Sequence, residues 1–385
     1  MNEFPSPSDV APWLDQDRTF AFLKGRIALH AILKAIGVGP GDRVVVPGFT
    51  CIVVPAAITY LGAEPVFYDI MPDGINGDPS AAVSLLDERT RAVILQHSFG
   101  YPCESEPVLS ACADRGIAVI EDCAHVQGAT WHGRPVGTLG DAAFCSFQWS
   151  KPVTAGLGGL ALANTENLRV RLAELHATVY RDPGFLYSLQ LDLLLYSHRL
   201  LFGPRLYWTA VSAYRWISGK GLVPGSSSNA ELTDATQPEG YERRFGRHRT
   251  RTLVRTLDRI LPSARTRVEN AGRIIDGLRD LDVTIPDPTP HTQPVPLRVP
   301  LMARDKAGIL AAARKERIEL GDWFDHPLHP MSASCGCFGY RESMCRNAEK
   351  SADRIVNIPT HDRLGPGEIR RILGFLASHR SMLAG

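Results

Sequence analysis

The sequence predicts an α/β protein with a mainly parallel sheet in a large domain and a smaller α+β domain at the C-terminus. Two observations lead to this prediction. Short β-rich runs alternate with helix-length amphipathic runs between Leu23 and Asn164, and the last third of the chain alternates helix and strand patterns. A length of 385 residues suits one large and one small domain. We therefore expect a large domain over residues 1–240 and a small one over 241–385.

The first part of the chain contains six β-rich runs bounded by turn residues. They are Arg43–Pro47, Pro65–Tyr68, Ala92–Gln96, Ile117–Ile120, Ala142–Phe147 and Gly159–Ala163. Helical patterns lie between most of them, for example at Ile27–Ile36 and Ser80–Leu86. Because strands joined through helices run parallel, these runs predict a parallel sheet.

The small domain is predicted from the pattern that follows Arg265. Helices and strands are expected, in chain order, at Arg267–Leu281 (helix), Leu297–Met302 (strand), Lys306–Arg317 (helix), Ile355–Ile358 (strand) and Gly367–His379 (helix). We expect this α+β segment to fold back on the large domain.

The segment Phe185–Gly219, inserted before the small domain, is dense in Leu, Tyr and Trp. Charged or histidine side chains interrupt it well before the roughly 20 apolar residues of a membrane span. They are Asp192, His198, Arg199, Arg205 and Arg215. Its aromatic and basic mixture is typical of a helix at a membrane interface. Burial in a dimer or against the small domain is the alternative, and both interpretations stay open.

Charge and cysteine content indicate the class of protein and its compartment. Lys and Arg total 42 against 41 Asp and Glu, so no overall basic charge argues for nucleic acid. The eight cysteines are scattered, and the N-terminus shows neither a basic start nor an apolar signal core. We expect reduced thiols and a cytoplasmic metabolic enzyme, with possible contact to the inner membrane face through residues 185–219.

An acid and a lysine occur close together between Glu121 and Gly159. Asp122 follows the predicted strand Ile117–Ile120 and Glu121, and ligands bind at the carboxyl ends of strands in open parallel sheets. Lys151 follows the next strand. Pyridoxal phosphate needs a lysine that bonds its aldehyde and a carboxylate that keeps its ring nitrogen protonated. The lysine pKa must then fall from about 10.4, which burial can achieve. An acidic helix cap is the simpler interpretation of Asp122 alone.

A phosphate group needs hydroxyls, backbone amides and preferably a helix N-terminus. Ser146 lies five positions before Lys151, and Gly25-Arg26-Ile27 is a glycine turn that opens a predicted helix. Each signal is weak alone, since serines in strands and glycines in turns are common. Together with Asp122 and Lys151 they predict a pyridoxal phosphate site.

Several motifs occur in the order seen in DegT/DnrJ/StrS-type aminotransferases, which the chain resembles most clearly over residues 20–165. They are Gly25–His30, Gly39–Pro47, Gly62–Asp69, His97–Gly100, Ile120–His125, Gly137–Asp141 and Ser146–Gly159, with looser matches at Asp322–Phe324 and Asn357–His361. The resemblance implies a fold type I pyridoxal phosphate enzyme that works as a homodimer. It further implies amino transfer, from glutamate, to a nucleotide-linked keto-sugar in cell-surface glycan or secondary-metabolite biosynthesis. If residues 185–219 contact a membrane, a lipid-linked keto-sugar is the alternative acceptor.

The resemblance also assigns roles to individual residues. Lys151 is implied to bond the cofactor aldehyde and Asp122 to pair with the ring nitrogen. His125 falls beside the ring hydroxyl, although a histidine satisfied elsewhere in the core is the alternative. Ser146 corresponds to the phosphate-binding serine. The amides of Arg26 and Ile27 occupy the positions that also hold phosphate.

The sequence departs from the family pattern at three places. Cys51 stands where a ring-stacking aromatic residue is common, and Leu157 replaces a glutamate. Tyr241–Phe245 lies near the segment that lends an asparagine to the partner subunit's site but does not match it. The acceptor is therefore less well defined than the cofactor. A dehydratase or other pyridoxal phosphate chemistry on a sugar or cyclitol, and a non-catalytic regulator, remain as alternatives.

A metal site is considered at Cys335-Gly-Cys337 and Cys345, with His326 and His329 nearby. A related branch of the family carries an iron-sulfur cluster, but it replaces the lysine by histidine. Lys151 is present here and no clear fourth ligand occurs. We predict no metal at these residues.

Overall fold

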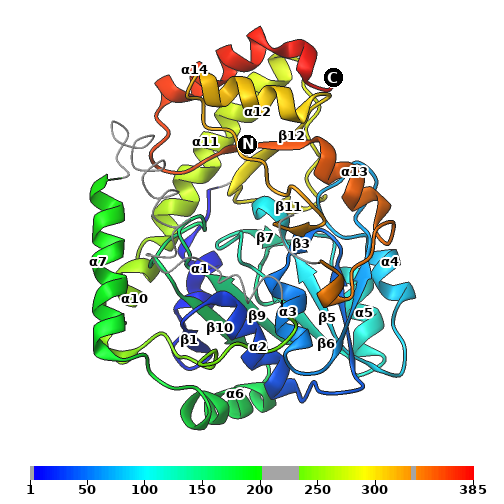
Figure 1. Ribbon diagram of the computed structural model, residues 1–385, viewed down its shortest axis with the longest axis vertical. Coiled ribbons are helices and arrows are strands. Elements are labelled where there is room, and N and C mark those ends of the chain that lie inside the picture. The colour runs from blue at the N-terminus through cyan, green and yellow to red at the C-terminus, as the bar shows by residue number, and fades with distance from the viewer. Residues whose placement is uncertain (1–3, 202–233, 331–334) are drawn as a thin grey trace.

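The computed structural model describes residues 4–201, 234–330 and 335–385 (Figure 1). The inserted segment predicted at 185–219 is described only as far as Leu201. Its remainder, with Arg205 and Arg215, lies outside the described residues.

The main sheet confirms the predicted mainly parallel α/β fold. Within the described residues it has seven strands in the order β1-β10-β9-β6-β5-β2-β4. In that order their bounds are Thr19–Phe22, Gly159–Ala163, Ala142–Ser146, Ala118–Asp122, Thr90–Gln96, Arg43–Pro47 and Glu64–Tyr68. Strands β9, β6, β5, β2 and β4 pair in parallel, whereas β10 runs antiparallel to both β9 and β1. The loop between β9 and β10 carries Lys151 and contains no helix, so the chain returns antiparallel.

Helices cover both faces of the sheet because alternate strand residues point to opposite sides. Val44, Val46 and Ile94 pack under α2 (Gly25–Ile36), α3 (Val53–Thr59) and α6 (Glu166–Thr178). Val45 and Val93 face the other side, toward α4 (Pro79–Ser84) and α5 (Glu106–Ala113). Strand β1 was not predicted, since its Thr-Phe-Ala-Phe run is short and lies directly before α2.

The C-terminal part forms a second core around an antiparallel pair of strands, β12 (Arg298–Met302) and β14 (Ile355–Pro359). Three helices pack on this pair: α11 (Ile260–Asp280), α12 (Lys306–Lys315) and α14 (Pro366–Ser378). Figure 1 shows them gathered at the end of the molecule away from the main sheet. These elements confirm the predicted C-terminal α+β pattern. We propose that the small domain, predicted at 241–385, is the unit built around this core.

Helix α11 belongs to both cores. Ile260, Ala264 and Val268 pack with β9 and β10, whereas Ile274 and Leu278 pack with β12 and β14. The predicted helix began at Arg267, so its first two turns were missed. Those turns connect the small domain to the sheet that carries the candidate site.

Shorter elements complete the described chain. The helices are α1 (Pro7–Leu14), α7 (Phe185–Leu201), α10 (Thr250–Leu257) and α13 (Arg346–Arg354), with single 3-10 turns at Ser98–Gly100, Arg247–Arg249, Cys335–Phe338 and Arg380–Met382. In one small sheet β7 (Thr130–Trp131) lies between β11 (Thr292–Gln293) and β8 (Arg134–Pro135). In another, β13 (Leu328–His329) pairs with β3 (Thr50–Cys51).

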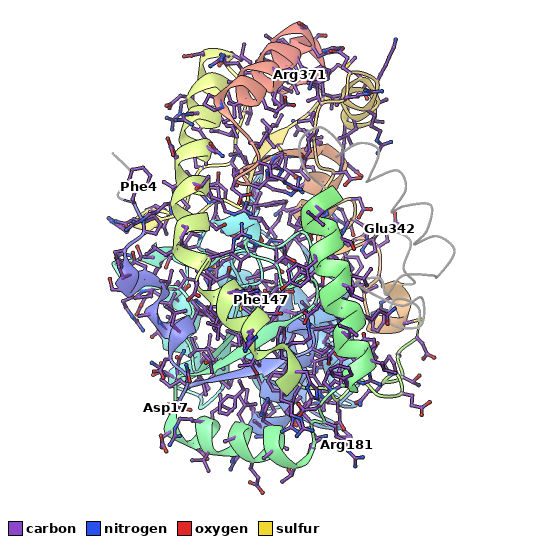
Figure 2. The ribbon with its side chains drawn as sticks, turned by 90° about the vertical axis from the view of Figure 1, so that its left-hand side faces the viewer. Phe4, Asp17, Phe147, Arg181, Glu342 and Arg371 are labelled. Carbon is purple, nitrogen blue, oxygen red and sulfur yellow. The ribbon has the colours of Figure 1, made fainter. Side chains whose placement is uncertain are left out.

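Helix α7 stands upright on the outside of the molecule (Figure 2). Its inner face buries Leu191 and Leu195, and Asp192 accepts a hydrogen bond from the buried Arg249 at 3.0 Å. Its outer face exposes apolar side chains at intervals of three and four residues: Leu186, Leu189, Leu193, Tyr196 and Leu200. None of the helices among residues 4–201, 234–330 and 335–385 has the length and apolar character needed to cross a bilayer.

Candidate active site

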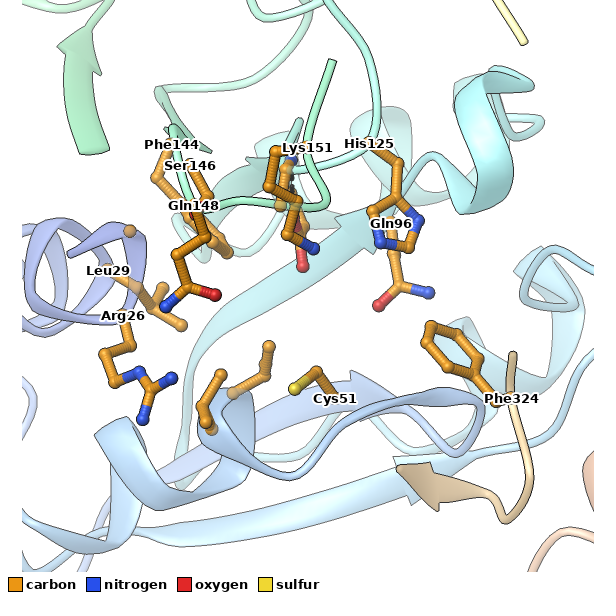
Figure 3. Close-up of a pocket in the computed structure, with 15 residues that line it drawn as sticks. Arg26, Leu29, Cys51, Gln96, His125, Phe144, Ser146, Gln148, Lys151 and Phe324 are labelled. Atoms are coloured by element: carbon orange, nitrogen blue, oxygen red, sulfur yellow. Dashed lines mark hydrogen bonds between the residues drawn. The ribbon is translucent and has the colours of Figure 1, made fainter. Parts of the chain in front are cut away.

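A pocket lies at the carboxyl ends of the parallel strands, beside the N-terminus of α2 (Figure 3). Six residues singled out in the sequence line it: Arg26, Cys51, Asp122, His125, Ser146 and Lys151. The chain thus brings together side chains from α2, β3, β6, β9 and the β9–β10 loop. Ile27 does not line the pocket, because its side chain is buried in the core and its amide donates to the Lys24 carbonyl at 3.1 Å.

Lys151 is held by the loop that carries it. Its amide donates to the Gln148 carbonyl at 3.1 Å, and the following Pro152 carbonyl accepts hydrogen bonds from Ser263 and Arg267, each at 3.0 Å. Burial lowers the pKa of the Lys151 ammonium, while the nearby Cys51 and Asp122 act in the opposite direction. The amine is therefore easier to deprotonate than an ordinary lysine, as a nucleophile requires.

Asp122 is the last residue of β6 and is buried. One carboxylate oxygen accepts the Ala124 amide at 2.9 Å. Burial raises the pKa of this carboxyl, against the effects of the Ala124 hydrogen bond, Lys151 and His97. A buried carboxylate of this kind gains most from a partner that carries a positive charge or a proton.

The tautomer of His125 follows from its contacts. Its Nδ1 accepts the Phe99 amide at 3.2 Å, and burial lowers the pKa of the imidazole well below its usual range. The neutral ring then carries its proton on Nε2, which makes Nε2 a donor. The ring stacks on Trp323, with centroids 5.5 Å apart and an interplanar angle of 13°. This contact fixes the imidazole at the wall of the pocket.

The α2 end of the pocket has the features of an anion site. Amides in the first turn of a helix point out of its N-terminus, and the helix dipole favours negative charge there. The turn approaches the sheet closely because Gly25 and Gly159 lack side chains: a Cβ on Gly159 would lie 2.5 Å from the Gly25 Cα. The Tyr241 hydroxyl donates to the Arg26 carbonyl at 3.2 Å and holds this turn in place. Ser146 adds a hydroxyl.

One wall of the pocket comes from the C-terminal part of the chain. Strand β13 pairs in parallel with β3, which places His329 opposite Cys51. Phe324 lines the pocket and packs edge-on against Phe49, with centroids 4.9 Å apart. The pocket residues Phe324, Gln96 and Gln148 were missed in the sequence. Gln96 ends a predicted strand as Asp122 does, so the same strand-end argument would have found it.

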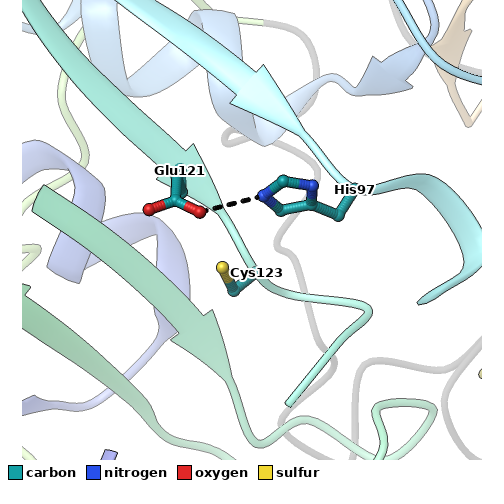
Figure 4. A group of neighbouring side chains, drawn as sticks. All are labelled: His97, Glu121 and Cys123. Carbon is teal, nitrogen blue, oxygen red and sulfur yellow. Dashed lines mark hydrogen bonds and ion pairs between the residues drawn. The ribbon is translucent and has the colours of Figure 1, made fainter. Parts of the chain in front are cut away.

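A second group of polar side chains, which includes both sequence neighbours of Asp122, is buried at the end of β6 (Figure 4). His97, Glu121 and Cys123 have the mutual spacing of metal ligands, but protein donors occupy the carboxylate. Glu121 accepts the amides of Gly137 (2.8 Å), Leu139 (2.7 Å) and Gly140 (3.1 Å). His97 Nδ1 accepts the Cys103 amide at 3.1 Å, so its Nε2–H donates to Glu121 at 3.2 Å. The group fixes the end of β6.

The cysteines considered for a metal lie in different surroundings. Cys345 is buried against Gly48, and burial raises the pKa of its thiol to about 12. Cys337 is exposed. His329 Nδ1 bonds to Asp325 at 2.6 Å, and His326 Nδ1 accepts the Leu328 amide at 3.1 Å. The side chain of Cys335 lies outside the described residues.

The pocket combines a buried lysine, a buried carboxylate and a helix N-terminus, an arrangement that defines the pyridoxal phosphate class of site. The chain belongs to the DegT/DnrJ/EryC1/StrS aminotransferase family, which it matches over residues 8–187 and 221–377.

Individual relatives resemble the chain in part of its length. It is 39% identical over 148 residues to GDP-perosamine synthase of Caulobacter vibrioides (38% of this chain, 40% of that protein). It is 35% identical over 171 residues to L-glutamine:scyllo-inosose aminotransferase of Streptomyces griseus (44% of this chain, 40% of that protein). These matches thus span about two fifths of each curated relative. The structure of DesV from S. venezuelae shares the fold, with 20% identity, a TM-score of 0.71 and coverage of 99% of this chain and 92% of that one.

The residues present fit pyridoxal phosphate, the cofactor implied by the family. The glycine pair lets the first turn of α2 lie close to Ser146, since a Cβ on Gly25 would lie 2.9 Å from the Ser146 Cβ, and a helix N-terminus favours an anion such as phosphate. Asp122 and Lys151 affect each other's pKa through space, and both line the same pocket. The donor set therefore suits the phosphate, ring nitrogen and aldehyde of the cofactor together.

Proposed function

We propose that this chain is a pyridoxal phosphate-dependent aminotransferase that moves an amino group from glutamate to a keto group on a sugar or cyclitol. The convergence of Lys151, Asp122 and His125 in one pocket beside the α2 N-terminus carries the proposal. The family supports amino transfer, and the relatives named above act on a GDP-linked sugar and on an inosose.

Each pocket residue has a chemical task in this proposal. When bound, pyridoxal phosphate supplies an aldehyde that captures amines and a ring that accepts an electron pair. Lys151 Nζ would hold the aldehyde carbon and, after a substrate amine replaces it there, would move a proton from the α carbon of the amino donor to that aldehyde carbon. Asp122 holds a proton at the ring nitrogen. His125 Nε2–H would donate to the ring hydroxyl, and Ser146, Arg26 and the α2 turn would bind the phosphate.

The test uses the absorption spectrum of the purified chain with added pyridoxal phosphate. We expect a visible band that glutamate converts to that of the amine form, and that scyllo-inosose or a GDP-linked keto-sugar restores. Lys151→Ala should lose the band, whereas the exposed Lys350→Ala should keep it. A chain that binds no pyridoxal phosphate would refute the proposal. If the chain binds pyridoxal phosphate but no amino acid converts the bound cofactor, a regulator is favoured. If a sugar substrate loses a hydroxyl and no amino group is transferred, a dehydratase is favoured.

We further propose a cytoplasmic homodimer in which the outer face of α7 contacts a second subunit. The exposed side chains on that face are uncharged and follow the spacing of three and four residues that helix pairs use. Leu186→Glu with Leu193→Glu should lower the molar mass measured by light scattering. If this pair instead abolishes flotation with anionic vesicles and leaves the mass unchanged, α7 contacts the membrane.

A further inference from the structure

A second cavity, of about 520 Å³, opens on the other side of Lys151. It lies between the lysine loop, the first half of α11 and the ends of β12 and β14. Because Lys151 lines both this cavity and the cofactor pocket, the two spaces adjoin at this residue. The cavity is therefore placed to hold a substrate.

Positive charge dominates the lining of this cavity. Four arginines (Arg259, Arg267, Arg298, Arg363) face two carboxylates (Glu319, Asp362). Both carboxylates have partners: Glu319 bonds to His361 at 3.2 Å and Asp362 to Arg259 at 3.0 Å. Burial opposes the charge of Glu319, but His361, Arg298 and Arg363 outweigh it and lower the pKa of the carboxyl to about 2. The excess positive charge favours an anionic substrate.

Ring contacts with Trp323 place Arg298 close to Lys151. Its Cζ lies 4.8 Å from the centroid of the Trp323 ring, and Lys151 Nζ lies 5.4 Å from the same centroid. The two cationic groups are therefore no more than about 10 Å apart. Arg298 also influences the pKa of Lys151 and of His125. A group bound to this guanidinium is within reach of the lysine amine.

The guanidinium of Arg298 is held in a defined orientation. Its Nη1 donates to Asn357 Oδ1 at 3.1 Å, and Asn357 Nδ2 donates to the Trp323 carbonyl at 2.7 Å. Gly321 leaves room for this arrangement, since a Cβ there would lie 2.5 Å from Arg298 Nη1 and 2.3 Å from Asn357 Oδ1. A fixed guanidinium loses less entropy when it binds a carboxylate than a mobile one does.

Two other arginines of the cavity, Arg267 and Arg259, are engaged differently. Arg267 is buried and donates to the Pro152 and Leu297 carbonyls and to Thr360. Arg259 is exposed and paired with Asp362. Arg298 combines a preset orientation with closeness to Lys151.

We propose that Arg298 binds a carboxylate of the amino-acid donor, an inference that rests on the proposed aminotransferase function. The amine of the donor reacts at the position of Lys151 Nζ, and an α-carboxylate carbon lies about 2.5 Å from its amine. A guanidinium–carboxylate hydrogen bond adds about 2.8 Å, and the upper limit of about 10 Å between the two cationic groups leaves room for this arrangement. Arg298 is thereby assigned to the donor rather than to an anionic group of the acceptor.

The test measures ligand binding by calorimetry on the cofactor-loaded protein, with succinate as an unreactive carboxylate and GDP as an unreactive diphosphate. Arg298→Gln should weaken succinate binding about 10- to 100-fold, because a charge-assisted hydrogen bond is lost. GDP binding should be unchanged. Arg259→Gln removes the same charge from the same cavity and should change succinate binding less than about threefold.

Three results would overturn the assignment: no succinate binding by the unaltered chain, equal losses in Arg298→Gln and Arg259→Gln, or loss of GDP binding with succinate binding kept. Circular dichroism spectra and melting temperatures equal to those of the unaltered chain exclude misfolding of the variants. Spectral conversion by glutamate is recorded separately. Its absence in the unaltered chain would contradict amino transfer, whereas succinate binding alone decides the role of Arg298.

Discussion

The Arg267 guanidinium donates a hydrogen bond of 3.0 Å to the Pro152 carbonyl, one residue beyond Lys151. The same guanidinium donates to the Leu297 carbonyl (3.2 Å) and to Thr360 (3.1 Å), beside the ends of β12 and β14. Burial lowers the pKa of Arg267 to about 10, so it keeps its charge at neutral pH. One buried cation thus ties the lysine loop to the C-terminal core.

Arg267→Met should lower the free energy of unfolding by about 3 kcal/mol, because several buried carbonyl and hydroxyl groups lose their donor. It should also weaken pyridoxal phosphate binding through the loosened loop. Urea unfolding and spectral titration measure the two effects. Arg265→Met, on the exposed side of the same helix, serves as the control. Equal stability of the two variants would contradict this role.

Gly159→Ala should destabilise the chain by about 1–3 kcal/mol, because the new Cβ meets backbone that cannot move aside. The contact is 2.5 Å to both the Cα and the amide nitrogen of Gly25. Since the displaced backbone is the first turn of α2, the affinity for pyridoxal phosphate should fall as well. Gly272→Ala in α11 meets no atom within 4 Å and should be neutral or slightly stabilising. Thermal unfolding of both variants, with and without pyridoxal phosphate, measures the two effects. Equal melting temperatures for the two variants would contradict the prediction.

Glu121→Gln should cost about 3 kcal/mol or more, because an amide cannot accept all the donors that now converge on the carboxylate. Three backbone amides and the His97 ring point at it. Added zinc or a chelator should leave the melting temperature unchanged, since the carboxylate serves backbone amides. A melting temperature that rises with zinc in the unaltered chain and not in Cys123→Ser would show a metal site instead.

His30 should make the chain less stable in mild acid. Burial, assisted by Lys34, lowers the pKa of its imidazole to about 4, whereas the unfolded value is 6.5. Between pH 6.5 and 4 the unfolded chain binds a proton that the folded chain does not, so the free energy of unfolding falls as the pH falls. The loss should approach about 3 kcal/mol at pH 4.

Urea unfolding at pH 7, 5.5 and 4.5 tests this expectation. His30→Gln should flatten the acid slope, while the exposed His132→Gln should keep it. Parallel slopes in all three proteins would show that other groups cause the acid sensitivity.

The fold could largely be predicted because hydrophobic period and turn residues are local signals. All six predicted strands of the large domain occur, within a few residues of their expected bounds. The antiparallel direction of β10 could not be foreseen, since it depends on the absence of a helix in the lysine loop. The first turns of α11 were missed because Pro262 lies in them, and proline is tolerated in the first turn of a helix.

The candidate site could be predicted only where its residues lie in motifs. Asp122, His125, Ser146 and Lys151 belong to one short stretch, and the structure brings them to one pocket. Phe324 and Arg298 come from segments more than 140 residues away in the sequence, and no local pattern indicates that they meet Lys151. Ile27 was expected to offer its backbone amide to phosphate together with Arg26, but that amide donates to the Lys24 carbonyl at 3.1 Å, which the sequence does not reveal.

Because α11 supplies side chains to both cores, it limits how chimaeras with related proteins can be built. A junction inside the helix would join two halves that come from different proteins and that each fit the core of their own parent. A junction after the helix would separate Arg267 from the Leu297 carbonyl and the Thr360 hydroxyl, to which it donates hydrogen bonds. A junction between residues 234 and 249 would transfer α11 together with β12 and β14, but would leave Ser263 and Arg267 to recognise a foreign lysine loop. Exchange of substrate preference by swapping C-terminal segments should therefore succeed only when the loop at 147–158 is exchanged as well.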